Sequence, residues 1–348
     1  MSKAEKIPIS YDEFYSRQLV MKELGREGQA KLARSKVAVV GLGGLGTVSS
    51  LYLTLAGVGH LRLIDQDTVE AHNLHRQVLY TLKDLRYPKA EVSAERLRTV
   101  NPFVKVEAVP ENINPDNVEG LLHGMDCIVD GLDNMRTRYL VNRACAKLKI
   151  PYVFGAAIGI EGNLSVFAPP ETPCLECVLP NLNDSNMLTC DVRGVLGATP
   201  GIIGTMQAME TIKVLTGMGS PLKGKLLICD FNDMYLTTID IFKRENCPAC
   251  QSQEATLKAK EKLVWLCGRN TANINPEKPI KLNLDKLYNI IKQSFRVRIK
   301  SSMAIVFTYK DHEITMFNGG RTLIKNVTNE EAALKVYREI AEKLELNS

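Results

Sequence analysis

No apolar run in this 348-residue sequence reaches the roughly 18 residues that a membrane-spanning helix needs. The N-terminal segment MSKAEKIPIS also lacks the apolar core of a secretory signal. The chain shows no bias towards disorder, because hydrophobic residues make up 45% of it and charged residues 24%. These absences predict a soluble cytoplasmic protein with no membrane partner, and the length favours two domains.

The net charge is +5, and the excess of positive charge lies entirely in the C-terminal part of the chain. From Lys262 to Ser348 there are 15 Lys and Arg against 9 Asp and Glu, whereas the first 261 residues hold 29 against 30. Such a basic segment fits an acidic protein partner, nucleic acid or a solvated face. A solvated face is the most frequent of the three, so nucleic-acid binding is not expected.

The segment from Val37 to Asp65 has the pattern of a nucleotide-binding strand–helix–strand unit. An apolar strand meets a glycine-rich loop, and a second strand ends in Asp65, nineteen residues after the last of these glycines. The loop glycines are Gly41, Gly43, Gly44 and Gly46. Glycine lets the backbone approach a phosphate, the helix N-terminus offers free N–H groups, and the aspartate can bond a ribose hydroxyl. By itself this fingerprint indicates first an NAD- or FAD-dependent enzyme.

Polar side chains are concentrated after Asp65, where a dehydrogenase usually has a plain loop and helix. They are Asp67, Asn73, Arg76, Gln77 and Lys89. A further predicted strand, Cys127 to Asp130, is followed by Asp133 and Asn134. Because ligands collect at the carboxyl ends of parallel strands, Asp133 is expected to face the same crevice as Gly43 and to hold a metal ion.

Together with Ser16-Arg17-Gln18, these motifs resemble in order and spacing those of the ThiF/MoeB family, whose members are relatives of the ubiquitin-activating enzymes. The resemblance covers about residues 10 to 250. The resemblance implies an α/β fold with a Rossmann-like, mostly parallel sheet and helices on both faces. It also implies a homodimer that uses Mg-ATP to adenylate the C-terminal Gly-Gly carboxylate of a small ubiquitin-fold or sulfur-carrier protein. No catalytic base is needed, because the attacking carboxylate is already ionised near neutral pH.

The resemblance also assigns roles to individual residues. It gives Asp65 to the ribose hydroxyls, Arg76 and Lys89 to the phosphates, and Asp133 to Mg²⁺. The remaining residues that would line the nucleotide pocket are the four loop glycines with Asp67, Asn73, Gln77 and Asn134. Arg17 by itself is typical of a surface arginine on a helix that starts at Ser10 and runs to Leu24, but the family supplies such an arginine to the partner's ATP.

Four of the nine cysteines form two C-x-x-C pairs, Cys174 with Cys177 and Cys247 with Cys250. In a large α/β chain two such pairs predict one tetrahedral structural Zn²⁺ site. Cys190 lies in a polar, unpatterned segment and has two interpretations. It is either a spare loop thiol or, by the resemblance, the nucleophile that takes the activated carrier as a thioester or through a persulfide, with Arg193 lowering its pKa.

We predict an adenylation domain over residues 1–254, a linker over 255–262 and a small α+β domain over 263–348. The last domain is expected to have the order βαββββα, with a hairpin turn at Gly319-Gly320. It would either stabilise the dimer or dock a protein partner through Arg296, Arg298 and Lys300 on one strand face. A rhodanese domain is rejected, because Cys267 is followed by Asn273 where that fold has an arginine.

Two other functions remain as alternatives. An NAD-dependent oxidoreductase would account for the glycine loop but leaves Arg17, Arg76, Lys89 and Asp133 without a role. A non-catalytic scaffold subunit of an activating complex would be expected to have lost ATP-binding residues, and none of the expected ones is missing.

Overall fold

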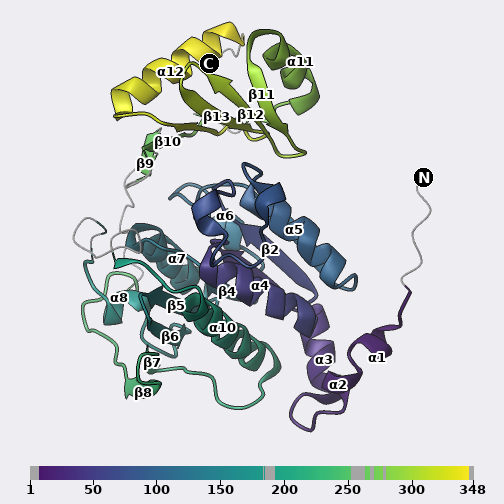
Figure 1. The fold of residues 1–348 in the computed structure, drawn as a ribbon. Helices are drawn as coiled ribbons and strands as arrows, with labels where there is room; N and C mark the ends of the chain where they lie inside the picture. The colour runs from purple at the N-terminus through teal and green to yellow at the C-terminus, as the bar shows by residue number, and fades with distance from the viewer. Residues whose placement is uncertain are drawn as a thin grey trace.

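The computed structural model describes residues 8–182, 184, 193–251, 263–266, 270–276 and 280–344, which form two domains, each built on its own sheet (Figure 1). The predicted linker over 255–262 lies outside the described residues. Among the described helices, none is long and apolar enough to cross a membrane.

The first domain contains an eight-stranded sheet in the order β3-β2-β1-β4-β5-β6-β7-β8. The five strands from β3 to β5 are parallel, whereas β6, β7 and β8 continue the sheet in antiparallel pairs. The strands are β1 (Lys36–Val40), β2 (His60–Ile64), β3 (Lys105–Val109), β4 (Cys127–Asp130), β5 (Tyr152–Ile158), β6 (Glu161–Phe167), β7 (Lys225–Asp230) and β8 (Tyr235–Asp240). The expected Rossmann-like α/β fold is confirmed, with three antiparallel strands at one edge.

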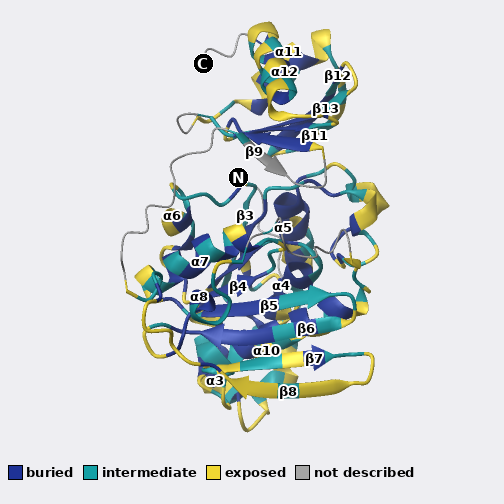
Figure 2. Ribbon diagram, turned by 90° about the vertical axis from the view of Figure 1, so that its left-hand side faces the viewer, coloured by how far each residue is buried: buried dark blue, intermediate teal, exposed yellow. Residues whose placement is uncertain are grey.

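Helices cover both faces of the parallel strands, and this explains why β1 is apolar at successive positions. Val37 and Val39 belong to one hydrophobic core, and Ala38 and Val40 to a second. The first core includes α3 (Gly25–Arg34), α4 (Gly44–Ala56), α5 (Lys89–Val100) and α10 (Ala198–Thr216), and the second includes α6 (Val118–Leu122), α7 (Met135–Leu148) and α8 (Leu175–Val178). Figure 2 shows the central strands buried and β8 exposed at the edge.

The N-terminal helix differs from the prediction. The Ser10 hydroxyl caps the first turn by accepting from the Glu13 amide at 3.1 Å, as expected, but the helix is divided into α1 (Tyr11–Phe14) and α2 (Ser16–Leu19). The break falls at Tyr15, which is 2% exposed and accepts a hydrogen bond from Asn101 at 2.6 Å. Burying this ring against α5's C-terminal end outweighs the local preference for one continuous helix.

The second domain is a six-stranded antiparallel sheet in the order β11-β12-β13-β14-β10-β9. Its helices α11 (Leu284–Ser294) and α12 (Glu330–Lys343) lie on the face turned away from the first domain (Figure 1). The strands are β9 (Leu263–Leu266), β10 (Thr271–Ile274), β11 (Arg296–Lys300), β12 (Ala304–Tyr309), β13 (His312–Phe317) and β14 (Thr322–Lys325). The expected α+β class is confirmed, and so is the hairpin turn, where Gly320 has a φ of +81°.

Two predictions for this domain are wrong. Strand β10 was not expected, because its four residues lack an apolar alternation, but all four are buried between β9 and β14. The three basic residues of β11 do not share a face, since the pairing with β12 shifts register between Val297 and Ile299. Arg298 donates to Thr308 on the face opposite the helices, whereas Lys300 pairs with Asp285 of α11.

Candidate nucleotide site

The glycine loop joins β1 to α4 in a conformation that requires several of its glycines. Gly41 has a φ of +86°, and a Cβ atom there would lie 2.6 Å from the Gly131 carbonyl oxygen. A Cβ atom on Gly46 would lie 1.8 Å from the carbonyl oxygen of Gly41. Gly43 is the N-cap of α4 and provides no side-chain cap, so the first N–H groups of this helix are available to an anion.

Asp65 lies at the end of β2, directly below the glycine loop. Its two carboxylate oxygens accept from the amides of Leu42 and Asp67, each at 2.7 Å. Burial raises the pKa of Asp65, and the nearby Lys89 cation and these two amides act against that rise. Each oxygen keeps a second lone pair, so the carboxylate can still accept from ribose hydroxyls.

The cation and amides predicted for the phosphates and the pocket lie beside this loop. Lys89 is 3% exposed, with its ammonium nitrogen 3.3 Å from Asp67. The Asn73 carbonyl oxygen accepts from the Glu70 amide, but the Asn73 amide nitrogen and the Gln77 carbonyl oxygen are buried without a hydrogen-bond partner. Buried polar atoms in native proteins are nearly always paired, so these two point to a polar ligand that completes the site.

Arg76 is held by its own turn. Its guanidinium donates to the His72 carbonyl oxygen at 2.7 Å and lies 2.8 Å from a ring nitrogen of His75. Its backbone carbonyl oxygen is 3.6 Å from the position of a Cβ atom on Gly44, so the residue borders the glycine loop. A different side-chain rotamer would be needed to bring its charge onto a phosphate.

Asp133 precedes α7 on the loop that touches Gly41. The Asn134 side chain caps α7 by accepting from the Thr137 amide at 2.9 Å, and its amide lies 3.3 Å from Asp133. The Asp184 carboxylate accepts from the Met135 amide at 2.6 Å and so occupies the same helix end. Asn134 therefore has a structural role that the sequence prediction did not include, and Asp133 beside it is exposed.

A buried ion pair beneath this loop was not predicted. The Arg138 Nε atom lies 3.0 Å from the Asp130 carboxylate, and the same guanidinium donates to the Leu132 carbonyl oxygen at 2.8 Å. Tyr152 donates to Asp130 at 2.7 Å. The signal available in the sequence was weak, since one arginine within a helix is usually a surface residue. We infer that this network positions Asp133 by fixing the backbone before it.

Replacing Arg138 by methionine is expected to destabilise the protein by about 3–5 kcal/mol, because Asp130 then stays buried without its counter-ion. Burial already raises the pKa of Asp130, and Arg138 opposes that rise. A carboxyl group whose pKa is raised in the folded state costs stability as pH increases above its ordinary value of about 3.9. Urea unfolding should therefore show a penalty that grows with pH above that value. Adding Asp130→Asn should recover part of the loss, and a pH-independent penalty would contradict this account.

Arg17 is not brought to this site within one chain. It is exposed on α2, and its neighbour Gln18 donates to the Ala56 carbonyl oxygen at the C-terminal end of α4. The glycine loop is at the other end of that helix, roughly 20 Å away at 1.5 Å per residue. An arginine side chain does not span this distance, so a role for Arg17 at a nucleotide requires a second copy of the chain.

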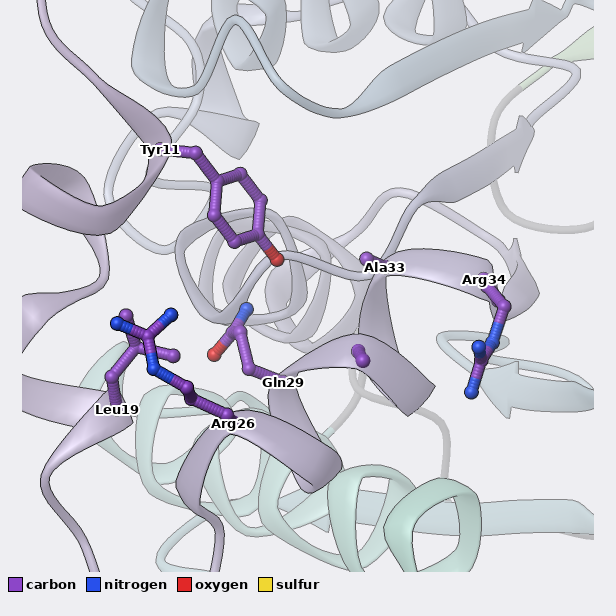
Figure 3. Close-up of a pocket in the computed structure, with 7 residues that line it drawn as sticks. Tyr11, Leu19, Arg26, Gln29, Ala33 and Arg34 are labelled. Atoms are coloured by element: carbon purple, nitrogen blue, oxygen red, sulfur yellow. The ribbon is translucent and has the colours of Figure 1, made fainter.

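A shallow hollow also lies at that far end (Figure 3). It has a volume of about 400 Å³ and is lined by residues that include Tyr11, Leu19, Arg26, Gln29, Ala33 and Arg34. Because Gln29 donates to Ala56 at the end of α4, this hollow is separate from the glycine loop. We do not assign it to the nucleotide, since none of the predicted phosphate or ribose ligands lines it.

The four predicted zinc ligands meet in one cluster. Their sulfur atoms all lie within 4.8 Å of one another, with Cys174 to Cys247 and Cys177 to Cys250 both at 3.5 Å. Tetrahedral zinc with bonds of about 2.3 Å to sulfur needs sulfur atoms about 3.8 Å apart. The cysteines therefore fit Zn²⁺. Burial raises the pKa of the Cys174 thiol, so a cation is what would make four thiolates stable there.

The first C-x-x-C pair is fixed to the second core. Glu176 lies between the two cysteines, and the Arg143 guanidinium of α7 donates to both of its carboxylate oxygens at 2.8 Å. Asn142 accepts from the Leu175 amide at 2.9 Å. A metal at the cluster would therefore connect α7 and α8 to the segment that follows β8.

Cys190 lies outside the described residues, so its predicted role stays a prediction. Arg193, expected to lower its pKa, forms a two-bond ion pair with Glu161 at 2.5 and 3.1 Å, and its effect on Cys190 likewise stays a prediction. Cys127, Cys145 and Cys229 are buried in the cores, as expected of structural cysteines.

Comparison with known proteins identifies the family. A family model described as ThiF family matches residues 15–249. The sulfur carrier protein adenylyltransferase of Thermus thermophilus is 41% identical over 242 residues, which cover 68% of this chain and 89% of that protein. The adenylyltransferase and sulfurtransferase MOCS3 of Culex quinquefasciatus is 41% identical over 246 residues, 70% of this chain but 56% of its own length. This chain thus spans little more than half of that relative.

Among solved structures, E. coli MccB superposes with a TM-score of 0.61 over 70% of this chain and 73% of its own, at 23% identity. At that identity the likeness shows the fold alone. The family match carries more, because residues 15–249 include the glycine loop and the polar segment that follows it. The chain belongs to the ThiF family, and the predicted adenylyltransferase class of enzyme is thereby confirmed.

Proposed function

We propose that this chain adenylates the C-terminal glycine carboxylate of a ubiquitin-like or sulfur-carrier protein and releases pyrophosphate. The observation that supports this most directly is the arrangement around the N-terminus of α4. The segments that flank this helix end carry Lys89, the Asp65 carboxylate, the unpartnered amide nitrogen of Asn73 and the unpartnered carbonyl oxygen of Gln77, and the first N–H groups of the helix have no side-chain cap. These groups suit the phosphates, ribose and polar base edges of ATP.

The proposed reaction needs alignment and charge neutralisation. The carrier carboxylate attacks the α-phosphorus, a P–O bond to the pyrophosphate breaks, and the electron pair leaves with pyrophosphate. Lys89 and the α4 N–H groups would offset the charge on the phosphates. Asp133 would hold Mg²⁺, which supplies further positive charge when bound. One aspartate would be enough for this role, because Mg²⁺ in proteins is usually bound by one or two carboxylates together with substrate phosphates.

The finer parts of the proposal are a homodimer in the cytoplasm, a structural Zn²⁺ and a second step at Cys190. In that step the Cys190 thiolate would attack the acyl adenylate and displace AMP to form a thioester. Membership of the ThiF family argues against the NAD-dependent alternative. The scaffold alternative predicts neither ATP binding nor exchange.

ATP–pyrophosphate exchange tests this function. Purified protein should exchange label only when a ubiquitin-fold protein ending in Gly-Gly is added, and the same carrier without its last two glycines should be inactive. Cys190→Ala should keep exchange, since adenylation precedes any thioester. No exchange across a panel of such carriers would count against adenylation, and a chain that also binds no ATP would favour the scaffold.

A further inference from the structure

The second domain contacts the first at the edge where the predicted ribose ligand lies. β13 and β14 face the carboxyl ends of β2 and β3, and several side chains of the described residues bond across between the two domains. Arg86 pairs with Glu313 at 2.7 Å, and Glu91 accepts from the Ser302 amide at 2.9 Å. Two further side chains make such contacts. Arg321 lies in the hairpin that joins β13 to β14, and Lys325 lies in β14.

Arg321 makes the most enclosed of these contacts. It is 4% exposed, and one guanidinium nitrogen donates to the Gln66 carbonyl oxygen at 2.7 Å and to the Pro110 carbonyl oxygen at 3.0 Å. The other terminal nitrogen donates to Asn273 at 3.0 Å, and the guanidinium lies 3.7 Å from the centre of the Phe317 ring. Gln66 directly follows Asp65, so Arg321 holds the backbone next to the ribose ligand.

Lys325 holds the same segment four residues further on. Its ammonium lies 2.5 Å from the Glu70 carboxylate and donates to the Thr68 hydroxyl at 3.1 Å. On its inner side the segment is bonded to the first domain, since the Lys89 amide donates to the Asp67 carbonyl oxygen at 2.9 Å. Residues 66–70 are therefore clamped between the start of α5 and the second domain.

The choice of a buried cation needs an explanation. Burial lowers the pKa of Arg321 to about 10, with the carboxylates of Asp67 and Asp65 acting in the opposite direction. Its Nε atom is buried without a hydrogen-bond partner. Where a contact only holds two domains together, apolar side chains usually stabilise it as well as a buried charge does, and they carry no such desolvation cost. The Asp67 and Asp65 carboxylates are close enough to act on the Arg321 cation, so the contact is electrostatic as well as adhesive.

We propose that Arg321 is a positioning residue for nucleotide binding, and that the second domain completes the ribose corner by fixing residues 65–70. This inference rests on the proposed function, because it takes ATP as the ligand. It gives the second domain a role in ATP recognition, in addition to the predicted roles in docking or dimer stability.

The test compares Arg321→Gln with Arg298→Gln, an exposed arginine of the same domain whose guanidinium donates to Thr308. Calorimetric titration with ATP should show about a tenfold higher Kd for Arg321→Gln, the loss expected for one charge-assisted hydrogen bond. The preference for ATP over 2′-deoxy-ATP should shrink in the same variant, because Asp65 is the displaced group. Exchange kinetics should show a raised KM for ATP with kcat within about twofold.

Arg321→Lys serves where the glutamine variant does not fold. It keeps the charge but not the two-carbonyl contact, so an intermediate Kd is expected. A wild-type Kd and an unchanged ATP to 2′-deoxy-ATP ratio in folded Arg321 variants would overturn the inference, as would equal weakening by Arg298→Gln. A wild-type chain that binds no ATP would overturn the proposed function itself, and this inference with it.

Discussion

Mixing two inactive variants, Arg17→Ala and Asp133→Ala, is expected to restore about a quarter of the wild-type exchange activity in a two-fold symmetric dimer. Each single variant should lose about 10²–10³ in rate, the cost of removing one group that stabilises charge on the transferring phosphate. The structure supplies the reason, since Arg17 lies beyond the far end of α4 from the glycine loop and Gln18 bonds to Ala56 there.

The recovery follows from how the residues are shared. In a mixed dimer the Arg17→Ala chain keeps its own Asp133 and receives Arg17 from its partner, so one of the two sites is complete. Random exchange makes about half of the dimers mixed, and half of their sites are intact. Activity is measured by carrier-dependent ATP–pyrophosphate exchange after co-expression or subunit exchange.

A matched control removes the source of the arginine. Mixing Arg17→Ala with a chain that carries both substitutions leaves no Arg17 in any dimer, and this mixture should stay inactive. If the first mixture is no more active than its components, Arg17 does not act across an interface. Sedimentation of the wild-type protein gives the oligomeric state independently.

Removing zinc should lower the melting temperature by about 6–12 °C, the shift expected when a metal contributes about 3 kcal/mol to a domain of this size. The four cysteines connect α8, fixed to α7 by the Arg143–Glu176 pair, to the segment after β8. Without the metal, four buried thiols replace four metal bonds and the end of the sheet loses its attachment. Scanning calorimetry before and after chelation measures the change.

Metal analysis provides the control for this prediction. Cys174→Ser should remove zinc and reproduce the lower melting temperature, whereas Cys145→Ala, at a buried thiol outside the cluster, should keep one zinc per chain. Protein that is purified without zinc yet melts at the same temperature as zinc-loaded protein would show that the cluster is not a structural metal site.

Much of the adenylation domain could be predicted from the sequence because its signals are local. Strand β4 was predicted with its observed bounds, and the glycine loop follows from positions where a Cβ atom would strike the backbone, as at Gly46. The spacing from that loop to Asp65 is set by one helix and one strand of ordinary length. Likewise, each C-x-x-C motif supplies two metal ligands within four consecutive residues.

Features that depend on contacts between residues distant in the sequence could not be predicted. Tyr15 interrupts a helix because Asn101 and Phe103 are there to bury it, and Lys300 leaves the face of Arg298 because β12 imposes a shift in register. The contact of Arg321 with Gln66 joins residues 255 positions apart. No local pattern encodes such a pair, since its free energy arises only when two domains exclude water between them. Local patterns therefore specify the nucleotide-binding unit and the cysteine cluster, whereas the position of the second domain beside Asp65 follows from contacts between distant residues.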